Sequence, residues 1–370
     1  MTTAPNKKLR VLIVDDSTFM RKVLQDIINA DPQLEVVGQG ADGRDGVALA
    51  ESLRPDVITM DINMPHLDGL QATELIMSQN PRPIVIVSSE SRDGTTSTLK
   101  ALDLGAVDFV TKPTSGIDLD MKSVAEDLTR KVKTAAKVRV VRTATRSALP
   151  MPRAPLSASA AAANSAALAQ AGGKIPMVVL AASTGGPAAI TRVVAGLPKD
   201  FPAAVFLIVH MPAAFTKQFA VQLTEIAALP VKEAEANEVP QAGKIYLCPG
   251  SHHLQITAAG KISLDPGPRI DGYRPCADLA LESIAACAGM LSVAVILTGM
   301  GADGAKGVKA VKGAGGCVLA QDEATSTIFG MPAEAIKTGV VEEVLGLDEI
   351  APALEKRVAK LLRLAPVGAR

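Results

Sequence analysis

The sequence contains no tryptophan and few other aromatic residues, with 7 Phe and 2 Tyr among 370 residues. So little aromatic volume predicts a core of aliphatic side chains, as in buried parallel sheets. The four cysteines form no CxxC pair and no zinc-site spacing, which favours reduced thiols in a cytoplasm. Lys plus Arg and Asp plus Glu are equal at 38 each, so no net charge favours nucleic acid or membrane surfaces.

Long hydrophobic runs are also missing. The apolar runs at 178–182 and 203–209 are far shorter than the ~18 residues that a membrane span requires. The N-terminus, MTTAPNKKLR, leads directly into a predicted strand and has no signal-peptide pattern. We therefore expect a cytoplasmic protein with no membrane insertion.

Short aliphatic runs alternate with amphipathic stretches over residues 1–133. This alternation is typical of βα units and predicts a parallel sheet with helices on both faces, that is, a (βα)5 domain. A final helix is predicted around residues 119–132. The five predicted strands are 10–14, 35–38, 56–60, 84–88 and 108–111.

Residues 134–174 break this pattern. The stretch has several Lys and Arg but no acidic residue, so it is basic, and it is rich in Ala, Ser and Pro, a composition typical of a flexible linker. The alternation resumes over 175–370, where three continuous apolar runs (177–182, 203–209 and 293–298) predict a second, mainly parallel, doubly wound α/β domain. Closely spaced runs at 244–248, 254–257 and 261–264, joined by glycine-containing turns, predict antiparallel strands at its margin.

Charged and polar side chains follow the predicted strands of the first domain. Asp15 and Asp16 end the first strand, Asp61 the third, Ser88 the fourth and Lys112 the fifth. Ligands bind outside the carboxyl ends of such strands at a switch point, and clustered carboxylates suit Mg²⁺. The set predicts phosphoryl transfer to the Asp61 carboxylate. The structural alternative is that Asp16 or Ser17 caps a helix.

The segments VLIVDDS, DVITMDINMPHLDGL, IVIVSS and GAVDFVTKP resemble those of the response-regulator receiver family over residues 10–133. The resemblance implies that Asp61 is the phosphoacceptor. It also implies an Mg²⁺ ion held by Asp15, Asp16, Asp61 and the backbone carbonyl of Asn63.

The same resemblance implies roles for three further residues. Ser88 and Lys112 would contact the phosphoryl group, and Phe109 would be the switch aromatic. Simple core packing is the alternative interpretation for Phe109.

Three residues of the second domain suggest nucleophilic catalysis. Ser183 follows one apolar run and precedes the helix-starting Pro187, His210 follows the next run, and Asp303 lies in GMGADG after a third. Side chains at three parallel strand ends can converge on one crevice as a Ser-His-Asp triad. The segment is not a GxSxG elbow, because Ala181 stands at its first glycine.

Each of these residues has a structural alternative. Ser183 could cap a helix, His210 could be a hydrogen-bonded core histidine, and Asp303 could cap the helix that follows it. A cysteine nucleophile, Cys248 or Cys276, has no support in the sequence beyond the presence of the thiol.

The ordered motifs AASTGGP, HMP, YRPCADLALES, TGMGADG and QDEATSTIFGMP, after a receiver and a linker, resemble the chemotaxis protein-glutamate methylesterase (CheB-type) family over residues 8–360. The resemblance implies that Ser183 is the nucleophile, His210 the base and Asp303 the orienting acid, with the backbone amides of Thr184 and Met300 as oxyanion donors. The domains implied are a receiver (1–133), a linker (134–174) and a methylesterase domain (175–370).

The implied function is phosphorylation-activated hydrolysis of glutamate methyl esters on the cytoplasmic helices of chemoreceptors, with possible deamidation of receptor glutamines. A histidine kinase would supply the phosphoryl group, and the unphosphorylated receiver would inhibit the esterase. We expect a monomer with no cofactor in the esterase domain and no nucleic-acid partner. Two other classes remain open: a phosphorylation-controlled binding module with an inactive hydrolase fold, and a DNA-binding regulator acting through the basic linker.

Overall fold

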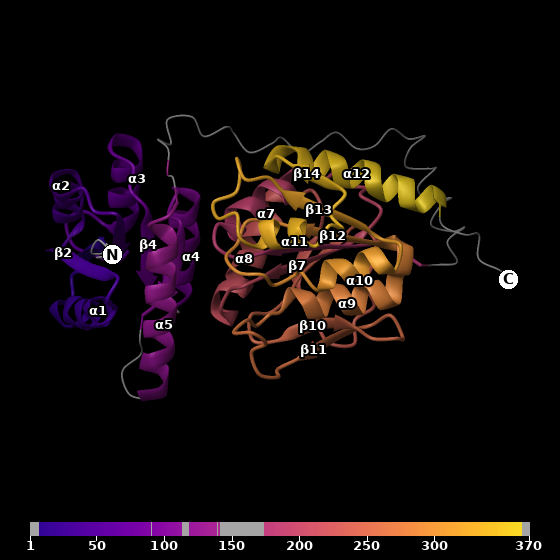
Figure 1. The fold of residues 1–370 in the computed structure, drawn as a ribbon, viewed down its shortest axis with the longest axis horizontal. Helices are drawn as coiled ribbons and strands as arrows, with labels where there is room; N and C mark the ends of the chain where they lie inside the picture. Colours follow the sequence, from indigo (N-terminus) through magenta and orange to yellow (C-terminus); the bar gives the residue numbers. More distant parts are fainter. Residues whose placement is uncertain (1–6, 90, 113–117, 139, 141–173, 365–370) are drawn as a thin grey trace, which may run out of the picture. The chain divides into compact units, whose positions relative to one another are not determined.

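The computed structural model describes residues 7–89, 91–112, 118–138, 140 and 174–364. The chain forms two compact units, residues 1–146 and 147–370, which are described separately (Figure 1). Most of the linker predicted at 134–174 lies outside the described residues.

The first unit is a five-stranded parallel sheet in the order β2-β1-β3-β4-β5. The five predicted strands are confirmed, with small differences at their ends. From β1 the chain first adds β2 on one side of the sheet and then adds β3, β4 and β5 on the other. This reversal of strand order makes the space between β1 and β3 the switch point of the sheet. The strands are β1 (Leu9–Val14), β2 (Leu34–Gly40), β3 (Val57–Met60), β4 (Ile84–Ser88) and β5 (Asp108–Thr111).

Five helices connect and cover these strands. Ser17 caps the first of them by accepting a hydrogen bond from the Met20 amide at 3.2 Å, so the capping interpretation holds for Ser17. The last helix continues to Ala135, two residues into the predicted linker. The helices are α1 (Thr18–Ala30), α2 (Gly43–Leu53), α3 (Gly69–Gln79), α4 (Arg92–Asp103) and α5 (Asp118–Ala135).

The second unit is built on a seven-stranded sheet in the order β14-β13-β12-β6-β7-β9-β8, and every pairing in it is parallel. The doubly wound α/β prediction is confirmed for both units. The strands are β6 (Met177–Ala182), β7 (Ala204–Val209), β8 (Val231–Glu233), β9 (Lys244–Leu247), β12 (Ser292–Ile296), β13 (Cys317–Gln321) and β14 (Glu343–Leu345).

One strand orientation was predicted wrongly. β9 runs parallel to β7 and β8 inside the main sheet, whereas its short distance from the following runs suggested an antiparallel strand. The three residues from Ile245 to Leu247 are fully buried, as expected for a parallel strand covered on both faces. Antiparallel pairing occurs between β10 (His253–Ile256) and β11 (Ile262–Asp265), which form a separate two-stranded sheet.

Helices cover both faces of the large sheet, with α7 and α12 on one side and α9 and α10 on the other (Figure 1). Among the described residues, no helix combines the length and the apolarity needed to cross a bilayer. The helices are α7 (Gly186–Ala195), α8 (Ala213–Ile226), α9 (Ala277–Ala288), the short 3-10 helix η2 (Gly289–Leu291), α10 (Gly307–Gly313), α11 (Met331–Lys337) and α12 (Leu347–Leu364).

The core of the second unit is mainly aliphatic, as the shortage of aromatic residues predicts, but five aromatic side chains are fully buried in it, namely Phe201, Phe206, Phe215, Phe219 and Tyr246. Every residue of β6, β7, β12 and β13 is buried, because helices cover both faces of these central strands. β6 is the first strand of the unit, and the chain builds outward from it in both directions. The carboxyl end of β6 is therefore a second switch point, where ligands of α/β sheets bind.

Candidate functional site

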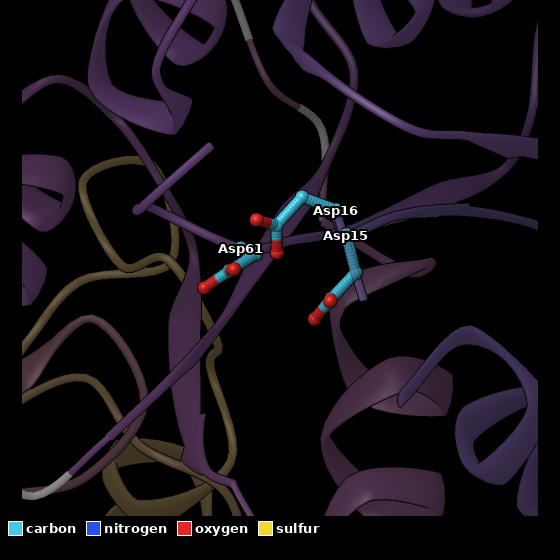
Figure 2. Close-up of side chains that lie close together, drawn as sticks. All are labelled: Asp15, Asp16 and Asp61. Carbon is cyan, nitrogen blue, oxygen red and sulfur yellow. The ribbon is translucent and has the colours of Figure 1, made fainter. Parts of the chain in front are cut away.

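The first cluster lies at the carboxyl ends of β1 and β3. The last residues of these strands, Val14 and Met60, are register partners, which brings the aspartates that follow them together. One carboxylate oxygen from each of Asp15, Asp16 and Asp61 lies within 4.8 Å of the others, and Figure 2 shows the three side chains. Three carboxylates at this spacing fit a hard divalent cation such as Mg²⁺.

Lys112 joins this cluster from the end of β5. Its Nζ lies 2.9 Å from Asp15 Oδ2 and 2.8 Å from Asp61 Oδ2. Burial raises the pKa of Asp61 above its ordinary value, although the hydrogen bond from Lys112 acts in the opposite direction. Burial alone would lower the pKa of Lys112, but its hydrogen bonds to Asp61 and Asp15 outweigh that effect and raise it. The ammonium group therefore stays charged beside the carboxylates.

The remaining predicted receiver residues differ in their surroundings. Ser88 is buried at the end of β4, and its hydroxyl donates to the Gly94 carbonyl oxygen at 3.3 Å. Phe109 is buried in β5, and Lys131 Nζ lies 5.0 Å from the centre of its ring. Phe109 thus packs in the core, as its structural alternative predicts, while its switch role stays a prediction. Asn63 is exposed in the loop after β3.

Ser183 directly follows β6 at the switch point of the large sheet. Its amide donates to the Thr298 carbonyl oxygen at 3.0 Å, and its own carbonyl accepts from the Gly186 amide at 2.7 Å. The N-cap of α7 is Gly185, with φ of 75° and no side-chain cap. The helix-cap interpretation of Ser183 is therefore wrong, and its half-buried side chain is left for another role.

His210 directly follows β7, the neighbour of β6. Ala182 and Val209 are register partners, and the His210 amide donates to the Ala182 carbonyl oxygen at 3.2 Å. Ser183 and His210 therefore start from adjacent points on the same sheet edge. The His210 side chain is only 10% exposed.

The His210 imidazole is oriented by a carboxylate. Its Nε2 lies 2.8 Å from Asp303 Oδ2. Its Nδ1 is buried and has no hydrogen-bond partner within the described part of the chain. Nδ1 is thus the ring nitrogen that can accept a proton, while the Nε2–H donates to Asp303.

Asp303 lies seven positions beyond Ile296, the last residue of β12, so it belongs to the following loop and not to the strand end. Its carboxylate accepts hydrogen bonds from the amides of Ala277 at 2.7 Å and Asp278 at 3.0 Å, at the N-terminus of α9. Asp303 does not cap α10, whose first amides are bound by the Asp278 carboxylate. Burial alone would raise the pKa of Asp303, but the hydrogen bond from His210 and the α9 amides hold it below its ordinary value.

Neither of the two cysteines considered, Cys248 and Cys276, is a competing nucleophile. The Cys276 thiol lies 3.3 Å from Asp303 Oδ1, and its pKa is raised to about 12 by burial and by that carboxylate. Burial also raises the pKa of the Cys248 thiol far above its ordinary value. Nucleophilic cysteines instead have a lowered pKa, so both thiols are structural.

Two loops adjoin Ser183 and contain the predicted oxyanion donors. Thr184 begins the turn before α7, and its carbonyl accepts from the Thr298 hydroxyl at 3.0 Å. Met300 follows Gly299, where an added Cβ would lie 2.8 Å from the Ser183 Cβ. The backbone at Gly299 therefore passes directly beside the serine, while the oxyanion role of the Thr184 and Met300 amides stays a prediction.

Tyr273 was given no role by sequence reasoning, although it begins the motif YRPCADLALES. Its ring stacks on the His210 imidazole, with centroids 4.3 Å apart and planes at 21°. No spacing rule predicts this contact, because the tyrosine comes from a turn between β11 and α9.

Comparison with known proteins supports one family for the whole chain. The family model for CheB methylesterase matches residues 178–354, and that for the response regulator receiver domain matches residues 11–122. A protein-glutamate methylesterase/protein-glutamine glutaminase of Pyrococcus horikoshii is 42% identical over 95% of this chain and 94% of its own length. The protein of the same name from Symbiobacterium thermophilum is 42% identical over 97% of this chain and 100% of its own length.

A solved structure, the CheB methylesterase catalytic domain of Thermotoga maritima, is 41% identical and covers 49% of this chain and 97% of that chain, with a TM-score of 0.48. The relatives from P. horikoshii and S. thermophilum match both units over nearly their full length. The chain therefore belongs to the CheB methylesterase family and has a response-regulator receiver domain at its N-terminus.

Proposed function

We propose that this enzyme hydrolyses glutamate γ-methyl esters on the cytoplasmic helices of chemoreceptors and uses Ser183 as its nucleophile. The observation that carries the proposal is the His210–Asp303 pair, which leaves the imidazole Nδ1 without a hydrogen-bond partner among the described residues, at the sheet edge where Ser183 stands. The names of the relatives, protein-glutamate methylesterase/protein-glutamine glutaminase, support this substrate class.

The reaction follows from the roles of these three side chains. His210 Nδ1 takes the Ser183 hydroxyl proton while the serine oxygen attacks the ester carbonyl carbon. Collapse of the tetrahedral intermediate breaks the bond to methoxide, which takes the proton from His210 and leaves as methanol. Water, deprotonated by His210, then attacks the acyl carbon; the bond to the Ser183 oxygen breaks, His210 returns the proton to that oxygen, and the receptor side chain leaves as a glutamate carboxylate. Asp303 stays ionised and stabilises the imidazolium in both steps.

The backbone amides of Thr184 and Met300 are proposed as donors to the negatively charged carbonyl oxygen of the intermediate. Thr184 follows Ser183 in the chain, and Met300 follows Gly299, whose backbone lies beside the serine; both placements support this role. The same steps with ammonia as the leaving group would deamidate a receptor glutamine, which fits the second activity in the relatives' names.

Regulation is proposed to come from the receiver domain. Asp61 would accept a phosphoryl group from a histidine kinase, with Mg²⁺ held by Asp15, Asp16, Asp61 and the Asn63 carbonyl. The bound cation would neutralise phosphoryl charge. Lys112 and the Ser88 hydroxyl would contact the phosphoryl oxygens, and Phe109 would be the switch aromatic that responds to phosphorylation of Asp61. The unphosphorylated receiver would inhibit the esterase, and phosphorylation would release it. We propose a cytoplasmic monomer that binds no nucleic acid.

The test is methanol release from methylated receptor membranes, measured with and without a small phosphodonor and Mg²⁺. Release that rises with the phosphodonor in wild type but not in Asp61→Asn supports both proposals. Wild-type release no greater than that of Ser183→Ala would contradict the esterase assignment. Equal rates with and without the phosphodonor would contradict the regulatory one.

A further inference from the structure

One face of the His210 imidazole is covered by an aromatic ring. The Tyr273 and His210 ring centroids are 4.3 Å apart, and the planes are inclined by 21°. This is a stacked arrangement, which favours a defined orientation of both rings. The stack lies on the residue proposed as the general base, so its geometry bears on the reaction.

The turn that carries Tyr273 is closed by reciprocal backbone hydrogen bonds. The Ile270 amide donates to the Tyr273 carbonyl oxygen at 3.0 Å, and the Tyr273 amide donates to the Ile270 carbonyl oxygen at 2.8 Å. The two central residues, Asp271 and Gly272, both have positive φ, at 50° and 87°. Positive φ at both central positions is the feature of a type I′ turn, which holds the tyrosine backbone in one place.

The far end of the same side chain reaches the loop that carries Asp303. A Cβ added at Gly301 would collide with the Tyr273 hydroxyl oxygen, so the tyrosine packs against the bare backbone of this glycine. Gly301 lies between Met300 and Asp303. Tyr273 therefore contacts both the imidazole and the loop that supplies its carboxylate partner.

The hydrogen bond to Asp303 does not by itself fix the imidazole. A bond through Nε2 fixes one atom of the ring and leaves the ring free to tilt about that contact. Nδ1 has no hydrogen-bond partner in the described structure, so nothing at the opposite nitrogen opposes the tilt. A flat surface stacked on the ring does oppose it.

We propose that Tyr273 is a positioning residue that sets the plane of His210 and so aims Nδ1 at the Ser183 hydroxyl. The inference rests on the proposed role of His210 as the base. Because the stacked aromatic ring sets the plane of the imidazole, phenylalanine at this position should preserve activity.

The experiment compares Tyr273→Leu, Tyr273→Phe and Ile270→Ala in the full chain. Ile270→Ala is the matched control, because it changes the same turn but keeps both backbone hydrogen bonds that close it. Methanol release from methylated receptor membranes gives kcat and KM, and thermal unfolding shows that each variant is folded. We expect Tyr273→Leu to lose about 10-fold in kcat with little change in KM, as when an interaction made only in the transition state is removed. We expect Tyr273→Phe and Ile270→Ala to stay within about 3-fold of wild type.

A second readout does not depend on ester hydrolysis. The chain has only 4 His, so the NMR signals of labelled histidine side chains can be assigned with a His210→Gln variant. An aromatic ring stacked on His210 shifts its carbon-bound ring protons upfield. We expect this shift in wild type and Tyr273→Phe, and its loss in Tyr273→Leu.

Two results would overturn the inference: a His210 signal that does not respond to Tyr273→Leu, or a folded Tyr273→Leu enzyme with the wild-type kcat. Failure of the proposed function has a different signature, namely wild-type protein that releases no methanol. In that case the NMR comparison still shows whether the stack sets the imidazole.

Discussion

Replacing Asp303 with asparagine tests the hydrogen-bond network around the proposed base, because the change keeps the size of the side chain. The two carboxylate oxygens accept from different donors. Oδ2 accepts from His210 Nε2 and the Ala277 amide, and Oδ1 accepts from the Asp278 amide and the Cys276 thiol. An asparagine amide group must point its NH₂ at one of these pairs, so at least one backbone amide loses its acceptor.

The two orientations of this asparagine have different consequences for catalysis. With NH₂ toward His210, the imidazole must accept at Nε2, so its proton moves to Nδ1, the nitrogen that should take the serine proton. Holding a catalytic histidine in the wrong tautomer costs about 10⁴ in kcat, or roughly 5.4 kcal/mol in activation free energy at 1.36 kcal/mol per tenfold. With NH₂ toward Asp278, the tautomer survives and only the negative charge is lost, so we expect a smaller decrease, of about 10².

The assay is methanol release by Asp303→Asn, with thermal unfolding to show that the protein remains folded. We expect kcat to fall by about 10²–10⁴ with little change in KM. A folded Asp303→Asn enzyme within about 10-fold of the wild-type kcat would refute the assignment of Asp303 as the partner of the base.

Gly185→Ala should lower the free energy of unfolding by about 1–3 kcal/mol in denaturant titrations, because φ is 75° and the new Cβ would lie 2.5 Å from the Thr327 Cβ; an unchanged midpoint would contradict this. Iodoacetamide should not modify Cys276 in the folded protein at pH 8, because the pKa of this thiol is about 12 and the residue is buried. Modification at the rate of a free thiol would contradict its structural role. In the first unit, the hydrogen bond from Lys133 lowers the pKa of Asp31, so its contribution to stability is present above the unfolded-state pKa and is lost as the pH falls through the lower folded-state pKa. Asp31→Asn should therefore be less stable than wild type at pH 7 and equally stable at strongly acidic pH. The same difference in free energy of unfolding at both pH values would disprove this link between the pKa of Asp31 and stability.

The central strands could be predicted from the sequence because they are buried on both faces. Such strands appear as continuous apolar runs, and those at β6, β7 and β12 start or end within two residues of their predicted bounds. β8 and β14 were missed. Both are three-residue strands at the edges of the sheet, and none of their residues is buried, so they leave no apolar run.

The residues of both sites could be proposed from the sequence because strand ends in a parallel sheet share one edge. That rule placed Asp15 and Asp61 correctly side by side at the end of neighbouring strands. It was less accurate for Asp303, which reaches His210 from a loop fixed by the N-terminus of α9. The strand-end rule could not predict the position of Tyr273, because this position depends on the path of a turn and not on a strand.

The central claim is that Ser183 is a nucleophile activated by His210. A fluorophosphonate probe followed by mass spectrometry of the labelled peptides tests this claim without requiring the receptor. We expect one adduct per chain, on Ser183, formed in wild type and suppressed in folded His210→Ala and Ser183→Ala proteins. Labelling of another residue, or labelling of Ser183 at the same rate without His210, would contradict the claim.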